Sequence, residues 1–184
     1  MTEIKKDFSA AEMRQLAMAA KAGESDAQTE LMARLYPPIR KHIGFVMGFT
    51  AIVEDVVQES MVAIYRALPT FRGDSSPKTW ALTIATRIAW KHQKHERRHA
   101  KEISSTADLA LYDLNQDAVA ETVFLAKAIS RLSSKKREIF VVMAILEMSA
   151  KEAAQILGIS ANTAASRFRH AREELQNLYT DKAC

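Results

Sequence analysis

Three histidines near the middle of the chain are the first residues whose spacing suggests chemistry. His92, His95 and His99 are separated by three and four residues, so on a helix they would share one face. Imidazoles placed in this way, here beside Glu96, can share a nickel, cobalt or zinc ion. The alternative is that they are polar side chains of a helix that faces DNA. We favour this alternative, because no thiolate and no pattern of outer hydrogen-bond partners accompanies the histidines.

Catalytic motifs are missing from the 184 residues of the sequence. It has no Gly-rich phosphate-binding loop, no H-E-x-x-H and no G-x-S-x-G. Glu54, Asp55 and Glu59 are close in sequence, but no nucleophile accompanies them. The single cysteine, Cys184, excludes a disulfide framework or a thiolate zinc site within one chain. We therefore expect a protein that is not an enzyme and that uses no cofactor and no small-molecule substrate.

Positive and negative charges are concentrated in two adjacent segments. Residues 87–101 contain six Lys or Arg and one acid, whereas residues 102–126 contain five acids and no Lys or Arg. Cations with an interleaved aromatic residue favour contact with nucleic-acid phosphates over an ordinary solvated surface. The acidic segment is not expected to contact DNA. The residues that carry the basic pattern are Arg87, Lys91, Lys94, Arg97 and Arg98, with Trp90 among them.

The segment from Ser149 to Leu178 has the pattern of a helix-turn-helix. Ser149 and Glu152 form a capping box that begins a short helix, and Gly158 suits the left-handed residue that ends it. Ser160 would then cap a longer helix rich in small and basic residues. Such a helix enters the major groove of DNA, where Arg pairs with guanine and Ser or Thr reach bases or phosphates. The alternative is a helical hairpin that only packs against its neighbours.

The elements that would hold these residues are all expected to be helices. Gly and Pro number only 5 and 4, and the plentiful Ala, Leu, Glu, Lys, Arg and Met favour helix over strand. A first helix begins with a capping box at Ser9 and stops at Gly23. A second begins near Ser25, and Pro37-Pro38 must bend or break it. Further helices are predicted at residues 52–68, 76–98, 117–132, 134–146, 150–157 and 161–178.

The helix that follows Ser76 would position both the histidines and the basic residues. Ser76 is its expected N-cap, and Pro77 occupies the first helical position, where the missing N–H costs nothing. Trp80, Ile84 and Ile88 repeat every four residues, so we expect them to form the buried side of this helix.

The predicted fold is all-α, with two small helical domains joined by a flexible acidic linker. The boundaries we expect are residues 1–98 for the first domain, 99–116 for the linker and 117–184 for the second domain. No apolar run approaches the roughly 20 residues that span a bilayer, and the N-terminal segment lacks the apolar stretch of a signal peptide. We therefore expect a cytoplasmic protein.

Several motifs in the first domain resemble those of one known family. A close resemblance to region 2 of the extracytoplasmic-function (group IV) bacterial sigma factors rests on Glu54-Asp-Val-Val-Gln-Glu59, Ala63-Ile-Tyr-Arg-Ala-Leu68, Phe71-Arg-Gly-Asp-Ser75 and Thr79-Trp80. The helix-turn-helix after the linker resembles region 4 of that family. The resemblance extends from about Ala17 to Leu178. It implies an alternative sigma factor, which binds core RNA polymerase and directs promoter recognition, melting and transcription initiation.

The resemblance also implies a role for individual residues. Those implied to dock onto the clamp helices of the largest polymerase subunit are Asp55, Val57, Gln58, Glu59, Ala63 and Arg66. Those implied to bind the promoter's minus-10 element, where the family captures a flipped base, are Ser75, Ser76, Lys78, Thr79, Trp80, Arg87, Lys91, Lys94 and Arg98. Those implied to bind the minus-35 element are Thr163, Ala165, Ser166, Arg167, Arg169, His170 and Arg172.

Further partners follow from the same resemblance. Region 4 would meet the flap of the second-largest polymerase subunit, and an anti-sigma factor, often membrane-anchored in this family, would hide the polymerase-binding surfaces. The chain departs from the usual family residues at Pro77, Thr83, Ala165 and Arg169, so we expect altered promoter specificity. Two other hypotheses stay open. One is a helix-turn-helix regulator that binds a palindrome as a homodimer, and the other is a metal-binding sensor that uses the histidines.

Overall fold

The described part of the chain is helical and contains no strand, which confirms the predicted all-α class. The computed structural model describes residues 9–48, 51–99 and 125–180, with side chains described up to residues 95 and 177 in the last two ranges. The predicted linker, apart from its first residue, lies outside the described residues. The helices are α1 (Ala10–Lys21), α2 (Ser25–Met47), α3 (Val53–Ala67), α4 (Pro77–His99), α6 (Ser134–Phe140), α7 (Ala150–Leu157) and α8 (Ala161–Thr180).

Three shorter segments complete the described chain. A 3-10 turn at Leu68–Thr70 follows α3, and a π-helical turn at Val141–Ile145 extends α6. Residues 125–130 form a further helical segment. We refer to α1–α4 as the N-terminal unit and to residues 125–180 as the C-terminal unit.

Local sequence signals place the start of α1 as predicted. Ser9 accepts the backbone N–H of Glu12, and the Glu12 carboxylate accepts the backbone N–H of Ser9. This reciprocal pair is the expected capping box, which satisfies two backbone donors that a helix start otherwise leaves open.

Helix α2 runs through Pro37 and Pro38 without a break, so of the two predicted effects, a bend or a break, the break does not occur. The two prolines deprive the preceding turn of two backbone donors. Leu35 and Ile39, on either side of them, are both fully buried in the same core. This burial holds both halves of α2 against the core, because tertiary packing outweighs a local helix preference.

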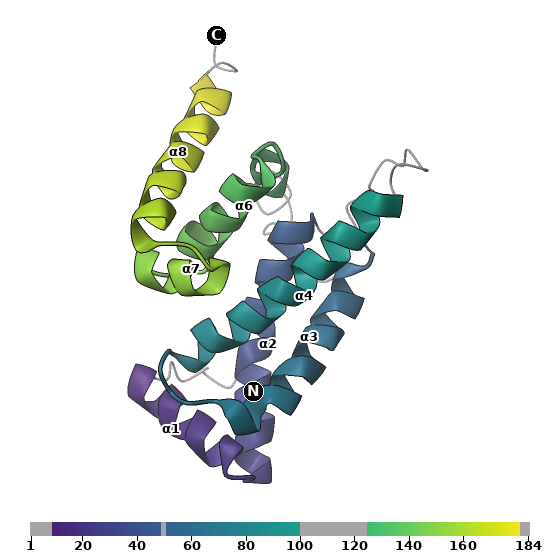
Figure 1. The fold of residues 1–184 in the computed structure, drawn as a ribbon, viewed down its shortest axis with the longest axis vertical. Helices are drawn as coiled ribbons and strands as arrows, with labels where there is room; N and C mark the ends of the chain where they lie inside the picture. The colour runs from purple at the N-terminus through teal and green to yellow at the C-terminus, as the bar shows by residue number, and fades with distance from the viewer. Residues whose placement is uncertain (1–8, 49–50, 100–124, 181–184) are drawn as a thin grey trace, which may run out of the picture.

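Helix α4 buries a different side from the one predicted. Trp80, Ile84 and Ile88 are only partly buried, although they border the core. Small side chains let α4 lie between the pair α2–α3 and helix α7, so it has core contacts on two sides (Figure 1). The fully buried residues of α4 are Thr79, Ala81, Leu82, Ala85, Thr86 and Ala89.

The hydrophobic core is continuous between the two units. Leu31 and Leu82 of the N-terminal unit belong to the same buried cluster as Ile139, Leu146 and Leu157 of the C-terminal unit. Helix α4 contacts α7, and α2 contacts both α6 and the π-helical turn (Figure 1). The two units are therefore joined by apolar packing.

One buried histidine connects α2 to α4. The Nε2 of His42 lies 2.9 Å from the Thr86 hydroxyl oxygen, which donates its own proton to the carbonyl of Leu82. The hydroxyl must therefore accept from His42, so the neutral ring carries its proton on Nε2. The Nδ1 atom has no hydrogen-bond partner among the described residues. Complete burial lowers the pKa of His42 from 6.5 to about 4.

We predict that His42 makes the fold sensitive to acid. The unfolded chain takes up the His42 proton near pH 6.5, whereas the folded chain does so only near pH 4. Stability is thus complete above pH 6.5 and falls as the pH drops toward 4, by about 3 kcal/mol in total. Urea unfolding should show a loss of about 2 kcal/mol between pH 7 and pH 5 in the parent chain, and His42→Gln should show a smaller one. Equal losses in both would contradict the assignment.

Candidate nucleic-acid interface

The exposed side of α3 carries most of the residues predicted to dock on polymerase. Asp55, Gln58, Glu59 and Arg66 are exposed, and Ala63 is half-buried. Asp55, Gln58 and Arg66 have no hydrogen-bond or ion-pair partner among the described residues. Their side chains can therefore meet an external partner without breaking an internal contact.

Val57 does not belong to this surface. Its side chain is 0% exposed and lies in the core. On a helix, a residue four positions after Val53 and seven before Ile64 shares their buried side. The side chain of Val57 therefore helps to pack α3 against the core. Val62 and Tyr65, which are 49% and 51% exposed on the same helix, were not among the predicted residues.

Glu59 links this surface to the basic helix α4. Its carboxylate lies 2.6 Å from the Nε2 of His92 and 3.8 Å from the ammonium of Lys91. The hydrogen bond with His92 is the main cause that lowers the pKa of Glu59. Among the described residues, no three His, Cys, Asp or Glu side chains gather as metal ligands do. The His99 side chain lies outside them.

One exposed side of α4 carries a row of cations. Arg87, Lys91 and Lys94 are exposed, and their spacing of four and three residues puts them on the same side. Trp80 begins this side, and its ring packs against Phe71 with a centroid distance of 5.1 Å and an interplanar angle of 56°. Arg98 is part of α4, but its side chain is outside the description. This row has the charge and the accessibility that phosphate binding requires.

The loop before α4 depends on glycine and on a serine cap. Gly73 has a φ of 78°, a left-handed conformation that suits glycine. The Ser76 hydroxyl accepts the backbone N–H of Thr79 at 3.0 Å and lies 2.8 Å from the Thr79 hydroxyl. Ser75 is partly exposed, and its hydroxyl has no partner within the described ranges. Of the two serines predicted to bind DNA, Ser75 is thus the free one.

Lys78 and Thr79 contact the C-terminal unit. The Lys78 ammonium donates to the carbonyl of Leu146 at 2.9 Å, and the Thr79 hydroxyl donates to the Glu152 carboxylate at 3.2 Å. Thr79 is 1% exposed. Burial lowers the pKa of Lys78, against the opposing effect of Glu147 and Glu152. These two predicted DNA contacts are therefore occupied in this arrangement.

Two further bonds join the units. The indole N–H of Trp90 donates to the Glu138 carboxylate at 2.9 Å, and the guanidinium of Arg137 donates to the carbonyl of Val46 at 3.4 Å. These contacts were not predicted, because the partners are 48 and 91 positions apart in the sequence.

The helix-turn-helix has the predicted local structure. Ser149 and Glu152 form the capping box of α7, and Gly158 ends that helix with a φ of 65°. The Ser160 hydroxyl accepts the backbone N–H of Thr163 at 3.1 Å and so caps α8. The expected bounds of both helices are confirmed apart from two further residues at the end of α8.

Five of the seven residues predicted to bind the minus-35 element are exposed on α8, and two are not. Thr163 is half-buried, and its hydroxyl lies 2.8 Å from that of Ser160. Arg167 is half-buried on the side next to the buried Ala164 and Ala171. The exposed residues are Ala165, Ser166, Arg169, His170 and Arg172.

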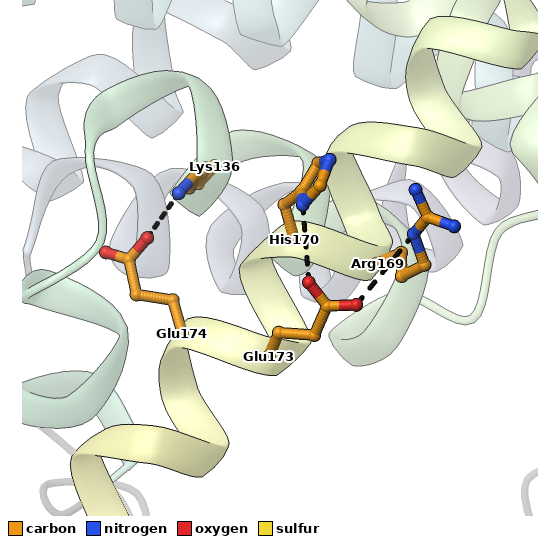
Figure 2. Close-up of polar contacts among 5 residues, drawn as sticks. All are labelled: Lys136, Arg169, His170, Glu173 and Glu174. Atoms are coloured by element: carbon orange, nitrogen blue, oxygen red, sulfur yellow. Dashed lines mark hydrogen bonds and ion pairs between the residues drawn. The ribbon is translucent and has the colours of Figure 1, made fainter.

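An acidic residue stands among the exposed cations of α8. The Glu173 carboxylate lies 3.9 Å from the Nε of Arg169 and 3.3 Å from the Nδ1 of His170, between the two side chains in Figure 2. Arg172 lies 5.9 Å above the centre of the Phe168 ring. Glu173 was not predicted as part of this surface, although its spacing from Arg169 is that of a helical ion pair.

The exposed side of α8 therefore has a mixed character. It also includes Asn162, which is exposed four positions before Ser166 and was not predicted as a DNA contact. A helix with this mixture of amide, hydroxyl and guanidinium groups can read base edges in a major groove. On the opposite side, Glu174 pairs with Lys136 and fixes α8 to α6 (Figure 2).

Comparisons with known proteins agree for both units. The sequence profile of Sigma-70 region 2 matches residues 31–99, and that of Sigma-70, region 4 matches residues 125–175. The ECF RNA polymerase sigma factor SigC of Mycobacterium tuberculosis is 25% identical over 162 residues, 87% of each chain. The ECF RNA polymerase sigma-E factor of Salmonella typhimurium is 31% identical over 144 residues, 68% of this chain and 72% of its own.

Two solved structures share the fold across both units. CnrH in complex with the cytosolic domain of CnrY is 28% identical, with a TM-score of 0.71 over 94% of this chain and 99% of its own. The sigma factor RpoE in complex with the anti-sigma factor NepR, from Bartonella quintana, is 25% identical. Its TM-score is 0.70 over 84% of this chain and 97% of its own. In the described residues, no helix has the length and apolarity needed to cross a membrane.

Proposed function

Because this chain belongs to the extracytoplasmic-function sigma factors of the sigma-70 family, we propose that its two units divide promoter recognition between them. The protein is an alternative sigma factor, which binds core RNA polymerase and directs transcription initiation. The N-terminal unit contains region 2, and the C-terminal unit contains region 4. We propose a task for each surface. We also propose that the protein acts in the cytoplasm, where core polymerase works.

Helix α3 would hold the clamp helices of the largest polymerase subunit. Asp55 and Gln58 support this proposal, because they are exposed and have no partner among the described residues. A carboxylate and an amide that are already free lose no internal bond when they pair with a basic or polar partner. Glu59 would contribute only after its contact with His92 is exchanged. Val62 and Tyr65 extend this surface with apolar contact area.

Helix α4 and the loop before it would bind the minus-10 element. The row Arg87, Lys91 and Lys94 supplies cations for the phosphates, and Ser75 supplies a free hydroxyl near the start of the helix. A flipped base costs a few kcal/mol of unstacking, which contacts in this loop would have to offset. Thr79 would join only when the C-terminal unit releases its hydroxyl, whereas the ammonium of Lys78 has further N–H donors beyond the bond to Leu146.

Helix α8 would read the minus-35 element, while the C-terminal unit meets the flap of the second-largest polymerase subunit. Control by an anti-sigma factor, membrane-anchored as is frequent in this family, completes the proposal. It is supported by the two solved relatives, each of which was determined with a second protein, an anti-sigma factor in one case. Neither the homodimeric regulator nor the metal sensor gains support from a feature of the described residues.

We predict that this chain, added to purified core polymerase, directs transcription from its own upstream region. Run-off transcripts with a defined start should form with the chain and should be absent with core polymerase alone. The physical basis is the pairing of a polymerase-binding helix with two DNA-binding helices in one chain. If sequencing of run-off products over a whole bacterial genome finds no start site that depends on the chain, the proposed function is wrong.

We predict that Asp55→Ala with Gln58→Ala weakens binding to core polymerase by roughly tenfold, because two charged or polar contacts are lost. Fluorescence anisotropy of the labelled full chain measures this affinity. The matched control is Gln15→Ala with Asp26→Ala, which removes the same groups from exposed positions on α1 and α2. The double α3 variant should still bind duplex DNA like the control. An equal loss of both activities would contradict the assignment of α3 to polymerase.

A further inference from the structure

The second residue of α8 has a free amide on the exposed side of the helix. Asn162 is exposed, and its side chain has no hydrogen-bond partner among the described residues. The neighbouring hydroxyls of Ser160 and Thr163 lie within hydrogen-bond distance of each other, and that of Ser166 donates to a backbone carbonyl. Among these described side chains in the first turns of α8, Asn162 is thus the one whose polar group is not engaged in a hydrogen bond. Residues at this end of a recognition helix are the ones that reach base edges.

Arg169 lies on the same side, two turns further along. Residues 162, 166, 169 and 173 follow each other at spacings of four, three and four, which keeps them on one face. Seven residues of helix span roughly 10 Å, which is about three base-pair steps of 3.4 Å. Glu173 approaches Arg169 through Nε, and Figure 2 shows its carboxylate beside that nitrogen. The terminal nitrogens of Arg169 therefore stay available for DNA.

The other cations of α8 are less suited to read bases. The guanidinium of Arg172 lies over the ring of Phe168, and Arg167 is half-buried near the core side. His170 contacts the same Glu173 carboxylate as Arg169, from the adjacent side of the helix. Asn and Arg are also the side chains that form paired hydrogen bonds with single bases, Asn with adenine and Arg with guanine.

We propose that Asn162 and Arg169 determine the sequence specificity of α8, and that Asn162 reads an adenine about three base pairs from a guanine read by Arg169. Glu173 is a positioning residue, which orients the guanidinium through Nε. The proposal rests on the proposed minus-35 function of α8 and adds which bases it selects and through which atoms.

The test uses holoenzyme and a promoter at which it initiates, randomised over ten base pairs around position minus 35. Sequencing of the bound DNA should show, for the parent chain, an adenine and a guanine two to four base pairs apart. Asn162→Ala should lose discrimination at the adenine alone, by about 5- to 100-fold, and Arg169→Ala at the guanine alone. Unchanged adenine preference in Asn162→Ala would overturn the proposal. If the parent chain selects no sequence at all, the minus-35 function itself is wrong.

Glu173→Gln tests the positioning role against Glu174→Gln, which removes the same charge from the side that faces α6. With Glu173→Gln, preference for the guanine should fall while that for the adenine stays at its parent value. With Glu174→Gln, both preferences should stay unchanged. A general rise in DNA affinity that is equal in the two variants, without a specific loss, would show that Glu173 acts only through its charge and would overturn its positioning role.

Discussion

Helix α4 has to satisfy three environments at once, and this constraint governs where the other elements lie. Toward α2 and α3 it presents short, fully buried side chains such as Ala81, Ala85 and Ala89, which allow the helices to approach closely. Toward α7 it presents Lys78 and Thr79, whose polar groups are bonded to the C-terminal unit. Its remaining side carries cations into solvent. Rotation of α4 would bury those cations or expose apolar surface, so the position of the basic row is determined by the core.

Glu152 combines a local task with a long-range one. One carboxylate oxygen accepts the backbone N–H of Ser149 at 3.0 Å and its hydroxyl at 2.7 Å, while the other accepts the Thr79 hydroxyl. Because different oxygens serve the two tasks, loss of Thr79 leaves the start of α7 intact. Separation of the helix-turn-helix from α4 would therefore leave the capping box of α7 in place. The Leu146 carbonyl, which loses its ammonium cap on separation, is then open to water or to another donor.

The parts of the fold that could be predicted depend on residues a few positions apart. Capping boxes at Ser9 and Ser149 and the left-handed Gly158 were confirmed, because each is completed by neighbours in sequence. A bend or a break was predicted at Pro37 and Pro38, and the break does not occur, since burial of the flanking residues comes from distant helices. The buried side of α4 was misjudged for a related reason. The large apolar residues were predicted to form the buried side, whereas a helix with neighbours on two sides buries its small residues.

The helices that carry the proposed sites were predicted, but some residues on them were not. The charge of those residues explains why. The prediction of DNA contacts favoured positively charged residues, so it did not include Asn162, which is neutral, or Glu173, which is acidic. On α8, however, Glu173 pairs with Arg169 and also contacts His170. This helix thereby contributes little net attraction for phosphates, and its groups are better suited to selecting bases. The row on α4 has the opposite character, because Arg87 and Lys94 have no acidic partner within the described residues. In the division of tasks that we propose, electrostatic affinity and base selectivity belong to different helices, and a promoter engages both.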